Sequence, residues 1–264
     1  METLRLHYDG PIAYLTLCRP AVHNAFNQRM LEELEKVFDE LAPQVRMVVM
    51  TGEGASFCAG ADVAWMKASA TGSAAENTQG AARMAALFRR IDETPQCVIG
   101  RINGATFGGG VGLVACCDVV VAASTARFSM SEVRLGLVPA VVSAFILPKI
   151  GVSQARRYFL TGERFGAEQA ASMGLVHKVV AAEKLDAAVE YFTDAIFKCA
   201  PGAVGEAKRL IRQMGVLEQT KALEYASQVI ADLRASQEGQ EGLAAFLEKR
   251  PAAWASKTPN ENPS

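Results

Sequence analysis

The sequence has few residues of the kinds that bind metal ions. It contains three histidines and six cysteines, with no HExxH segment and no CxxC pair. Zinc sites are built from such clustered ligands, so no metal site is predicted. Only Cys116 and Cys117 are adjacent, and they lie in an apolar run. Scattered cysteines of this kind are typical of buried thiols in a reducing compartment.

An excess of positive charge is also missing. The chain has 27 Lys and Arg residues against 28 Asp and Glu residues, which gives a formal net charge of −1. The densest basic cluster is the pair Arg89-Arg90. Because surfaces that bind polyanions carry a basic face or a basic excess, no nucleic-acid partner is expected.

Long hydrophobic runs are absent as well. The longest apolar runs fall well short of the roughly 18 residues that indicate a transmembrane helix. The N-terminal segment METLRLHYDG lacks the basic flank and the apolar stretch of a secretory signal. The sequence therefore predicts a soluble, cytoplasmic protein with no membrane association.

The chain does contain ample apolar material for a core, because half of its 264 residues are hydrophobic. Runs rich in β-formers at 12–17 and 46–52 alternate with segments of helical period such as 27–42. Strands separated by helices need crossover connections, so the strands should pair mostly in parallel. From about Gly151 the pattern is mainly helical, with one strand at 175–180. The predicted fold class is α/β.

The predicted organisation has three parts. Residues 1–200 form a strand-rich core, and residues 201–254 form a helical region with more apolar residues than its own packing requires. Such a region is typical of a subunit contact, so it is predicted to mediate oligomerisation. The polar, proline-containing tail 255–264 is predicted to be disordered.

A glycine-rich turn interrupts the apolar segment 103–122. Gly108 to Gly110 are adjacent and Gly112 follows, although a glycine inside a helix or strand costs roughly 0.5–1 kcal/mol relative to alanine. Close packing is one interpretation. A second is the dinucleotide fingerprint GxGxxA, with Glu132 as its acidic residue. That motif needs its first glycine directly after a strand, and residues 103–107 intervene, so the match is interpreted as accidental.

The third interpretation is a backbone N–H that faces a ligand oxygen as the oxygen gains charge during a reaction. Such an oxyanion hole usually needs two donors, and a second turn of small residues supplies a candidate. Ala59, Gly60 and Ala61 follow a buried strand. Asp62 is placed to cap a helix that begins near Val63, and this structural role is the preferred one for Asp62.

Five segments carry a resemblance to a known family. FCAGADV, NGATFGGGVGLVACCDVVVA and FSMSEVRLGLVP, preceded by RPAVHNAF and followed by LTGERFGAEQAASMGLVHKVV, resemble the enoyl-CoA hydratase/isomerase (crotonase) superfamily. The resemblance extends to about Trp254. It implies a crotonase-like spiral of ββα units with a helical C-terminal region, and assembly into homotrimers or into hexamers made of two trimers.

The resemblance also implies site residues. The N–H groups of Ala61 and Gly109 would bind the acyl thioester oxygen and stabilise a thioester enolate. The predicted coenzyme A contacts are Val22, Ala25, Ala59, Gly60, Ala61, Asp62, Val63 and Gly109, with Lys249 reaching the nucleotide phosphates. The thioester itself is the electron sink, so no cofactor is predicted beyond the coenzyme A of the substrate.

The family's hydratases carry two glutamates, and this chain departs from that pattern. The first position is Gly112 here, and the second is Glu132. Glu132 is predicted to act as general acid and base; the other interpretation is a surface ion pair. The segments GGGVGL and SEVRLGLVPAVVS are most similar to bacterial 3-methylglutaconyl-CoA hydratases of leucine degradation.

The predicted function is therefore addition or removal of water across a 2-enoyl-CoA double bond, with 3-methylglutaconyl-CoA and 3-hydroxy-3-methylglutaryl-CoA as the substrate pair. Candidate partners for a distal substrate carboxylate are Ser129, Ser131, Arg134 and Ser143. An enoyl-CoA isomerase and a non-catalytic CoA-binding module remain as alternatives. RNA binding, reported for a relative, is not favoured by the near-neutral charge.

Overall fold

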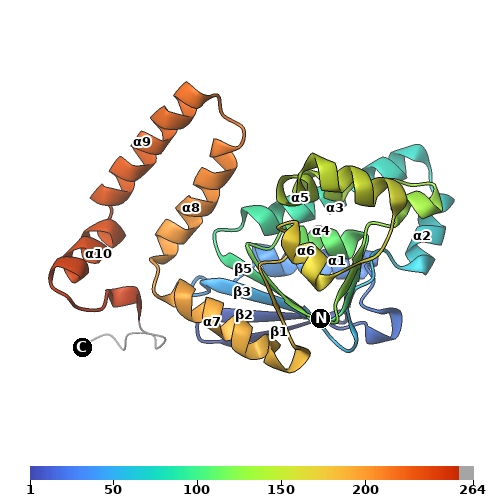
Figure 1. Cartoon of the computed structure of the whole chain (residues 1–264), viewed down its shortest axis with the longest axis horizontal. Coiled ribbons are helices and arrows are strands. Elements are labelled where there is room, and N and C mark those ends of the chain that lie inside the picture. Colours follow the sequence, from blue (N-terminus) through green and yellow to red (C-terminus); the bar gives the residue numbers. More distant parts are fainter. Residues whose placement is uncertain (256–264) are drawn as a thin grey trace.

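The computed structural model describes the backbone of residues 1–255 and, outside residues 68–70, their side chains. The predicted tail lies outside the described residues from Ser256 onward. Two sheets form the centre of the molecule (Figure 1). The larger one has the strand order β1-β2-β3-β5-β7-β10, with β1 antiparallel to β2 and the other neighbours parallel. Its strands are β1 Leu4–Asp9, β2 Ile12–Leu17, β3 Met47–Gly52, β5 Cys97–Ile102, β7 Val119–Ala123 and β10 Lys178–Val180.

The smaller sheet has the order β4-β6-β8-β9, and its last pair is antiparallel. Its strands are β4 Ser56–Cys58, β6 Ala105–Phe107, β8 Arg127–Ser129 and β9 Phe165–Gly166. Strands β3, β5 and β7 belong to the large sheet, and each is followed by a strand of the small sheet and then by a helix. The chain therefore repeats a ββα unit, which confirms the predicted crotonase-like fold.

Helices cover both faces of the large sheet. They are α1 Gln28–Asp39, α2 Val63–Ala70, α3 Ala74–Glu93, α4 Gly109–Ala115, α5 Ala140–Thr161, α6 Ala167–Ser172 and α7 Leu185–Phe197. Four short 3-10 helices are η1 Pro20–Val22, η2 Glu132–Leu135, η3 Ala182–Lys184 and η4 Ala253–Ala255. Helix α7 lies on one face of the sheet, and α1 and α3–α6 lie on the other (Figure 1).

The helices match the predicted helical segments except in where two of them begin. Helix α1 begins after Asn27, whose side chain accepts the Met30 N–H as an N-cap. Helix α5 begins at Ala140, earlier than the expected change of pattern near Gly151. Gly151 instead interrupts α5, because its φ of 71° is not helical.

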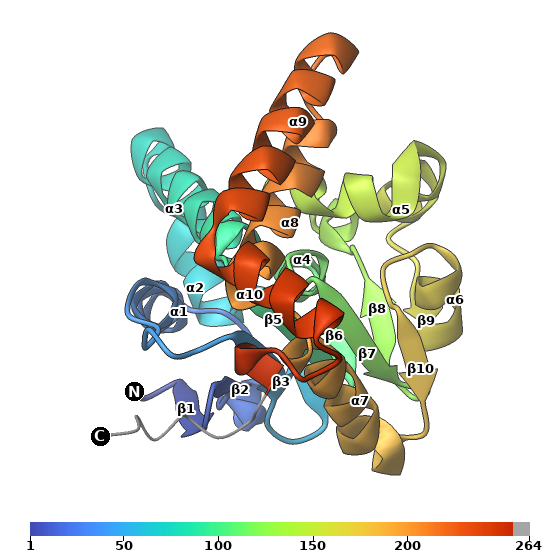
Figure 2. The same ribbon diagram turned by 90° about the vertical axis from the view of Figure 1, so that its left-hand side faces the viewer.

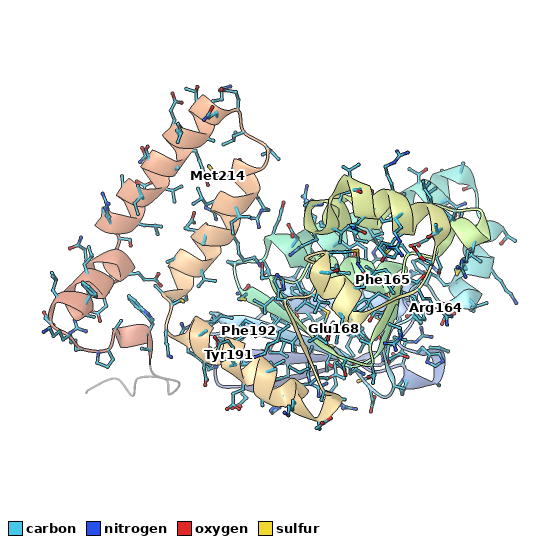
Figure 3. All side chains as sticks on the ribbon, viewed as in Figure 1. Arg164, Phe165, Glu168, Tyr191, Phe192 and Met214 are labelled. Carbon is cyan, nitrogen blue, oxygen red and sulfur yellow. The ribbon has the colours of Figure 1, made fainter. Side chains whose placement is uncertain are left out.

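Helices α8 Pro201–Met214, α9 Gln219–Ala235 and α10 Gln237–Leu247 form an arm that projects from the sheets (Figures 1 and 2). Met214 lies at the end of α8, away from the sheets (Figure 3). Lys208 of α8 pairs with Asp118 of the core at 2.7 Å, and Arg46 donates to the Trp254 carbonyl at 2.7 Å. These bonds attach the middle of α8 and the segment that follows α10 to the core.

No helix in residues 1–255 combines the length and the apolar character that crossing a membrane requires. The arm nevertheless exposes several large apolar side chains, namely Ile211, Val216, Leu223, Ile230, Leu243, Phe246 and Leu247. The division of the chain into a core and an oligomerisation region stays a prediction.

Candidate active site

Two glycine turns meet at the carboxyl ends of neighbouring strands. Strands β4 and β6 pair in parallel, so the turn that follows β4 lies beside the turn that follows β6. A Cβ on Gly60 would lie 3.0 Å from the Phe107 carbonyl oxygen and 3.6 Å from the Gly108 Cα. Gly60 and Gly108 also have positive φ values of 89° and 50°, which favour glycine. The structure therefore brings together the two turns that the sequence singled out.

The Ala61 N–H is left without a partner by the way its neighbours are bonded. Phe26 donates its N–H to the Gly60 carbonyl at 2.6 Å, and Asp62 donates to the Phe26 carbonyl at 2.7 Å. In this parallel bridge the bonds are made by the residues on either side of Ala61, so the N–H of Ala61 points to the opposite side.

Gly109 supplies a second free donor. It is the first residue of α4, and the first N–H groups of a helix have no partner within it. Within residues 1–255, neither the Gly109 N–H nor the Ala61 N–H donates to another protein group. Two unused backbone donors on touching turns are the arrangement that an oxyanion hole requires.

Packing explains the other two glycines. A Cβ on Gly110 would lie 2.3 Å from the Cys58 carbonyl oxygen, and one on Gly112 would lie 2.5 Å from Val142 Cγ1 and 3.0 Å from Phe88 Cε2. Close packing therefore explains Gly110 and Gly112, and the oxyanion-hole interpretation of Gly109 stays a prediction. Because Val142 and Phe88 fill the space beside Gly112, this site has no room for a carboxylate at that position.

Glu132 begins η2, three residues after the end of β8, and faces the turn at Gly108. Its Oε1 lies 3.4 Å from the point that a Gly108 Cβ would occupy. Its Oε2 is buried and makes no hydrogen bond in the described part of the chain. Burial raises the pKa of this carboxyl, with only the residue's own backbone N–H acting against it. The described residues give Glu132 no surface ion pair, and a carboxyl with a raised pKa beside free amides suits proton transfer.

Asp62 performs the structural role expected of it. Its side chain accepts the Ala64 N–H at 2.8 Å at the start of α2 and pairs with Arg19 at 2.8 Å. The hydrogen bond from Arg19 is the largest cause that holds the pKa of Asp62 below its usual value. Arg19 stands in the segment RPAVHNAF but was not among the predicted site residues.

The predicted coenzyme A contacts stay a prediction, and the structure shows only where their residues lie. Val22 and Val63 are exposed, whereas Ala25 is buried, and the Ala59 N–H is bonded to the His23 carbonyl. Lys249 lies in the turn after α10, on the arm. No contact in the described part of the chain joins it to the two turns.

A cavity of about 790 Å³ lies between α2, α3 and the segment after η2. Trp65 of α2 lines it, four residues after Ala61. Leu137 also lines it, and its N–H donates to the Glu132 carbonyl at 3.1 Å. The remaining wall includes Leu31, Met84 and Val141, together with the guanidinium-bearing Arg83. Its lining does not include Ala61, Gly109 or Glu132, so the cavity is connected to the two turns only through neighbours of these residues.

The four residues considered for a distal carboxylate do not line this cavity. The Ser129 hydroxyl donates to the Gly162 carbonyl at 3.1 Å, and the Ser143 hydroxyl donates to the Ala140 carbonyl at 2.6 Å. The Arg134 side chain and the Ser131 backbone lie against Gly162. Arg83, which was not among the predicted partners of a distal carboxylate, does line the cavity.

Comparisons with known proteins agree with this geometry. The family model described as enoyl-CoA hydratase/isomerase matches residues 8–257. A crotonyl-CoA hydratase of Syntrophomonas wolfei is 33% identical over 260 residues, which are 97% of this chain and 99% of that protein. A crystal structure of an enoyl-CoA hydratase from Shewanella pealeana superposes with a TM-score of 0.91 at 37% identity, covering 96% of each chain. A crystal structure of an enoyl-CoA hydratase/isomerase from Marinobacter aquaeolei superposes with a TM-score of 0.92 at 33% identity, covering 97% of this chain and 100% of the other.

The chain belongs to the enoyl-CoA hydratase/isomerase family. The predicted superfamily and fold are confirmed, and relatives named as hydratases support the prediction of a hydratase-type enzyme.

The raised pKa of Glu132 predicts how its replacement changes stability. An unfolded glutamate loses its proton near pH 4.3, by typical values, whereas the folded one keeps it to higher pH. The stability that Glu132 contributes is therefore present below the unfolded pKa and is lost as the pH rises through the folded pKa. Glu132→Gln cannot ionise, so its Tm should exceed that of the parent at pH 8 by about 1–3 °C and match it near pH 4.

Glu32→Gln is the matched control, because hydrogen bonding to Gln28 is the main cause that lowers the pKa of Glu32. It should gain no stability at pH 8. A Glu132→Gln variant that is less stable than the parent at pH 8 would contradict the burial of an unpartnered carboxylate.

Proposed function

We propose that this chain is a single-glutamate hydratase/dehydratase that adds water to, or removes it from, a 2-enoyl-CoA. The observation that carries the proposal is the position of the Glu132 carboxylate over Gly108, beside the free N–H groups of Ala61 and Gly109. The family membership and the relatives named as hydratases support the same reaction.

The chemistry follows from these three groups. The thioester oxygen accepts hydrogen bonds from Ala61 and Gly109. The Glu132 carboxylate takes a proton from a water molecule while the water oxygen bonds to C3, and the electron pair of the double bond moves into the thioester as an enolate. Protonated Glu132 then delivers the proton to C2 and is regenerated as a carboxylate. Each step is reversible, so the same groups serve dehydration.

For the acyl group we propose 3-methylglutaconyl-CoA and its hydrated form, 3-hydroxy-3-methylglutaryl-CoA. The sequence resemblance supports this pair, and Arg83 in the cavity lining offers a cation for the distal carboxylate. The Glu35 carboxylate accepts hydrogen bonds from the Arg83 guanidinium at 2.6–3.2 Å, whereas the bond to Glu32 is longer, at 3.4 Å. We propose that the substrate carboxylate takes the place of Glu32.

Enoyl-CoA isomerisation is the second candidate, because one carboxylate can carry a proton between C2 and C4. The Glu132 carboxylate beside the turn at Gly108 is the observation that keeps isomerisation open. A non-catalytic CoA-binding module would have no use for a buried carboxylate whose pKa is raised, so it is the weaker alternative.

We also propose that the active form is a homotrimer or a hexamer of two trimers. The apolar side chains exposed on α8–α10 support this assembly; Phe246 of α10, for example, is 80% exposed. Lys249 stays the proposed contact for the nucleotide phosphates of coenzyme A.

The reaction is tested with 3-methylglutaconyl-CoA in labelled water. The parent should add one water molecule, and Glu132→Gln should lower the rate by about 10²–10⁴-fold, as expected for loss of a general acid–base group. Label incorporation without a mass gain of one water would indicate double-bond migration instead. Activity of Glu132→Gln within about tenfold of the parent would remove Glu132 from the mechanism.

The acyl specificity is tested with Arg83→Met. Losing a hydrogen bond to a charged group should raise KM for 3-methylglutaconyl-CoA by about tenfold or more, with little change for crotonyl-CoA, which has no distal carboxylate. Arg90→Met is the control, because Arg90 lies on the same helix and pairs with Asp39 outside the cavity lining. Equal effects of Arg83→Met on the two substrates would contradict this subsite.

A further inference from the structure

Asp62 places a carboxylate one residue from the amide that is proposed to bind the thioester oxygen. The residue is 9% exposed, and its pKa is lowered, so it is ionised at neutral pH. A negative charge this close to a developing enolate opposes the reaction, because buried charges of like sign repel strongly. The N–H groups of Ala64 and Trp65 offset part of this charge at the start of α2, and a cation is needed to cancel the rest.

Arg19 occupies the position that does so. Its Nη2 lies 2.8 Å from Asp62 Oδ2, and the two side chains are only 20% and 11% exposed. A pair so far removed from water is screened much less than one at the surface.

Arg19 is itself held at both of its ends. Its Nη1 donates to the Ala25 carbonyl at 2.5 Å, and its backbone N–H donates to Asn24 Oδ1 at 2.8 Å. Ala25 precedes Phe26, whose backbone is hydrogen-bonded to the residues on either side of Ala61. The guanidinium thus joins the turn that carries Phe26 to the turn that carries Ala61.

We propose that Arg19 is a positioning residue that neutralises Asp62, so that the enolate forms beside a neutral ion pair rather than beside a bare carboxylate. This inference rests on the proposed function. In it, Asp62 fixes the start of α2 as an N-cap, and Arg19 removes the electrostatic cost of having a carboxylate at that point.

A double-mutant cycle separates this role from simple structural support. Arg19→Met leaves Asp62 uncompensated and should lower kcat about tenfold or more, with KM within about threefold, because the charge matters most when the enolate forms. Asp62→Asn keeps the cap, since asparagine is equally good at that position, and removes the charge that Arg19 is proposed to cancel, so it should lower kcat less than Arg19→Met does. The double variant should then be faster than Arg19→Met alone.

If the ion pair only supported the structure, removing both partners would lower the rate at least as much as removing Arg19 alone. A double variant no faster than Arg19→Met would therefore overturn the proposal. Arg5→Met is the control for loss of an arginine ion pair, because Arg5 pairs with Glu53 at an exposed position. If Arg19→Met does not fold, Arg19→Gln with and without Asp62→Asn makes the same comparison.

A spectroscopic readout makes the test independent of turnover. Acetoacetyl-CoA forms an enolate that absorbs in the near ultraviolet, and its enolised fraction when bound reports how well the site stabilises that charge. Arg19→Met should lower the enolised fraction at a given pH, and adding Asp62→Asn should restore it. A parent that shifts enolisation but does not hydrate enoyl-CoA would refute the proposed function alone, whereas no restoration would refute the role of Arg19.

Discussion

The site depends on the short parallel bridge between Phe26 and Ala61. Its two hydrogen bonds use the Gly60 carbonyl and the Asp62 N–H, which leaves the intervening N–H with no protein partner. Because backbone N–H groups in folded proteins are almost always bonded, one without a protein partner is available to a ligand. The contact between Gly60 and Gly108 then brings the start of α4 to the same place. Backbone pairing thus sets the geometry of the proposed site.

The single carboxylate follows from packing around the same turns. Val142 and Phe88 close the space beside Gly112, so Glu132 alone carries the proton-transfer chemistry that we propose. Its burial without a partner costs stability and raises its pKa. Both effects have one cause, because burial disfavours the charged form. The raised pKa makes the Glu132 carboxylate a stronger base, which suits the proposed proton transfer.

Apolar runs, helical periods and turn residues predicted an α/β chain with mostly parallel strands, whereas the ββα repeat was implied by the resemblance to a known family. The sequence also drew attention to residues 59–61 and 108–110, because adjacent small residues there expose the backbone. It missed the short strands β4, β6, β8 and β9, which have two or three residues each and too little periodicity to detect. It also missed Arg19 and Arg83, whose roles depend on partners 43 and 48 residues away along the chain.

The central claim is that the amides of Ala61 and Gly109 converge on one oxygen. A crystal structure with a bound non-reactive acyl-CoA tests it most directly. The account predicts the thioester oxygen at about 2.7–3.1 Å from both nitrogens, with the Glu132 carboxylate on the side of C2 and C3. A thioester oxygen that contacts neither amide would contradict the account.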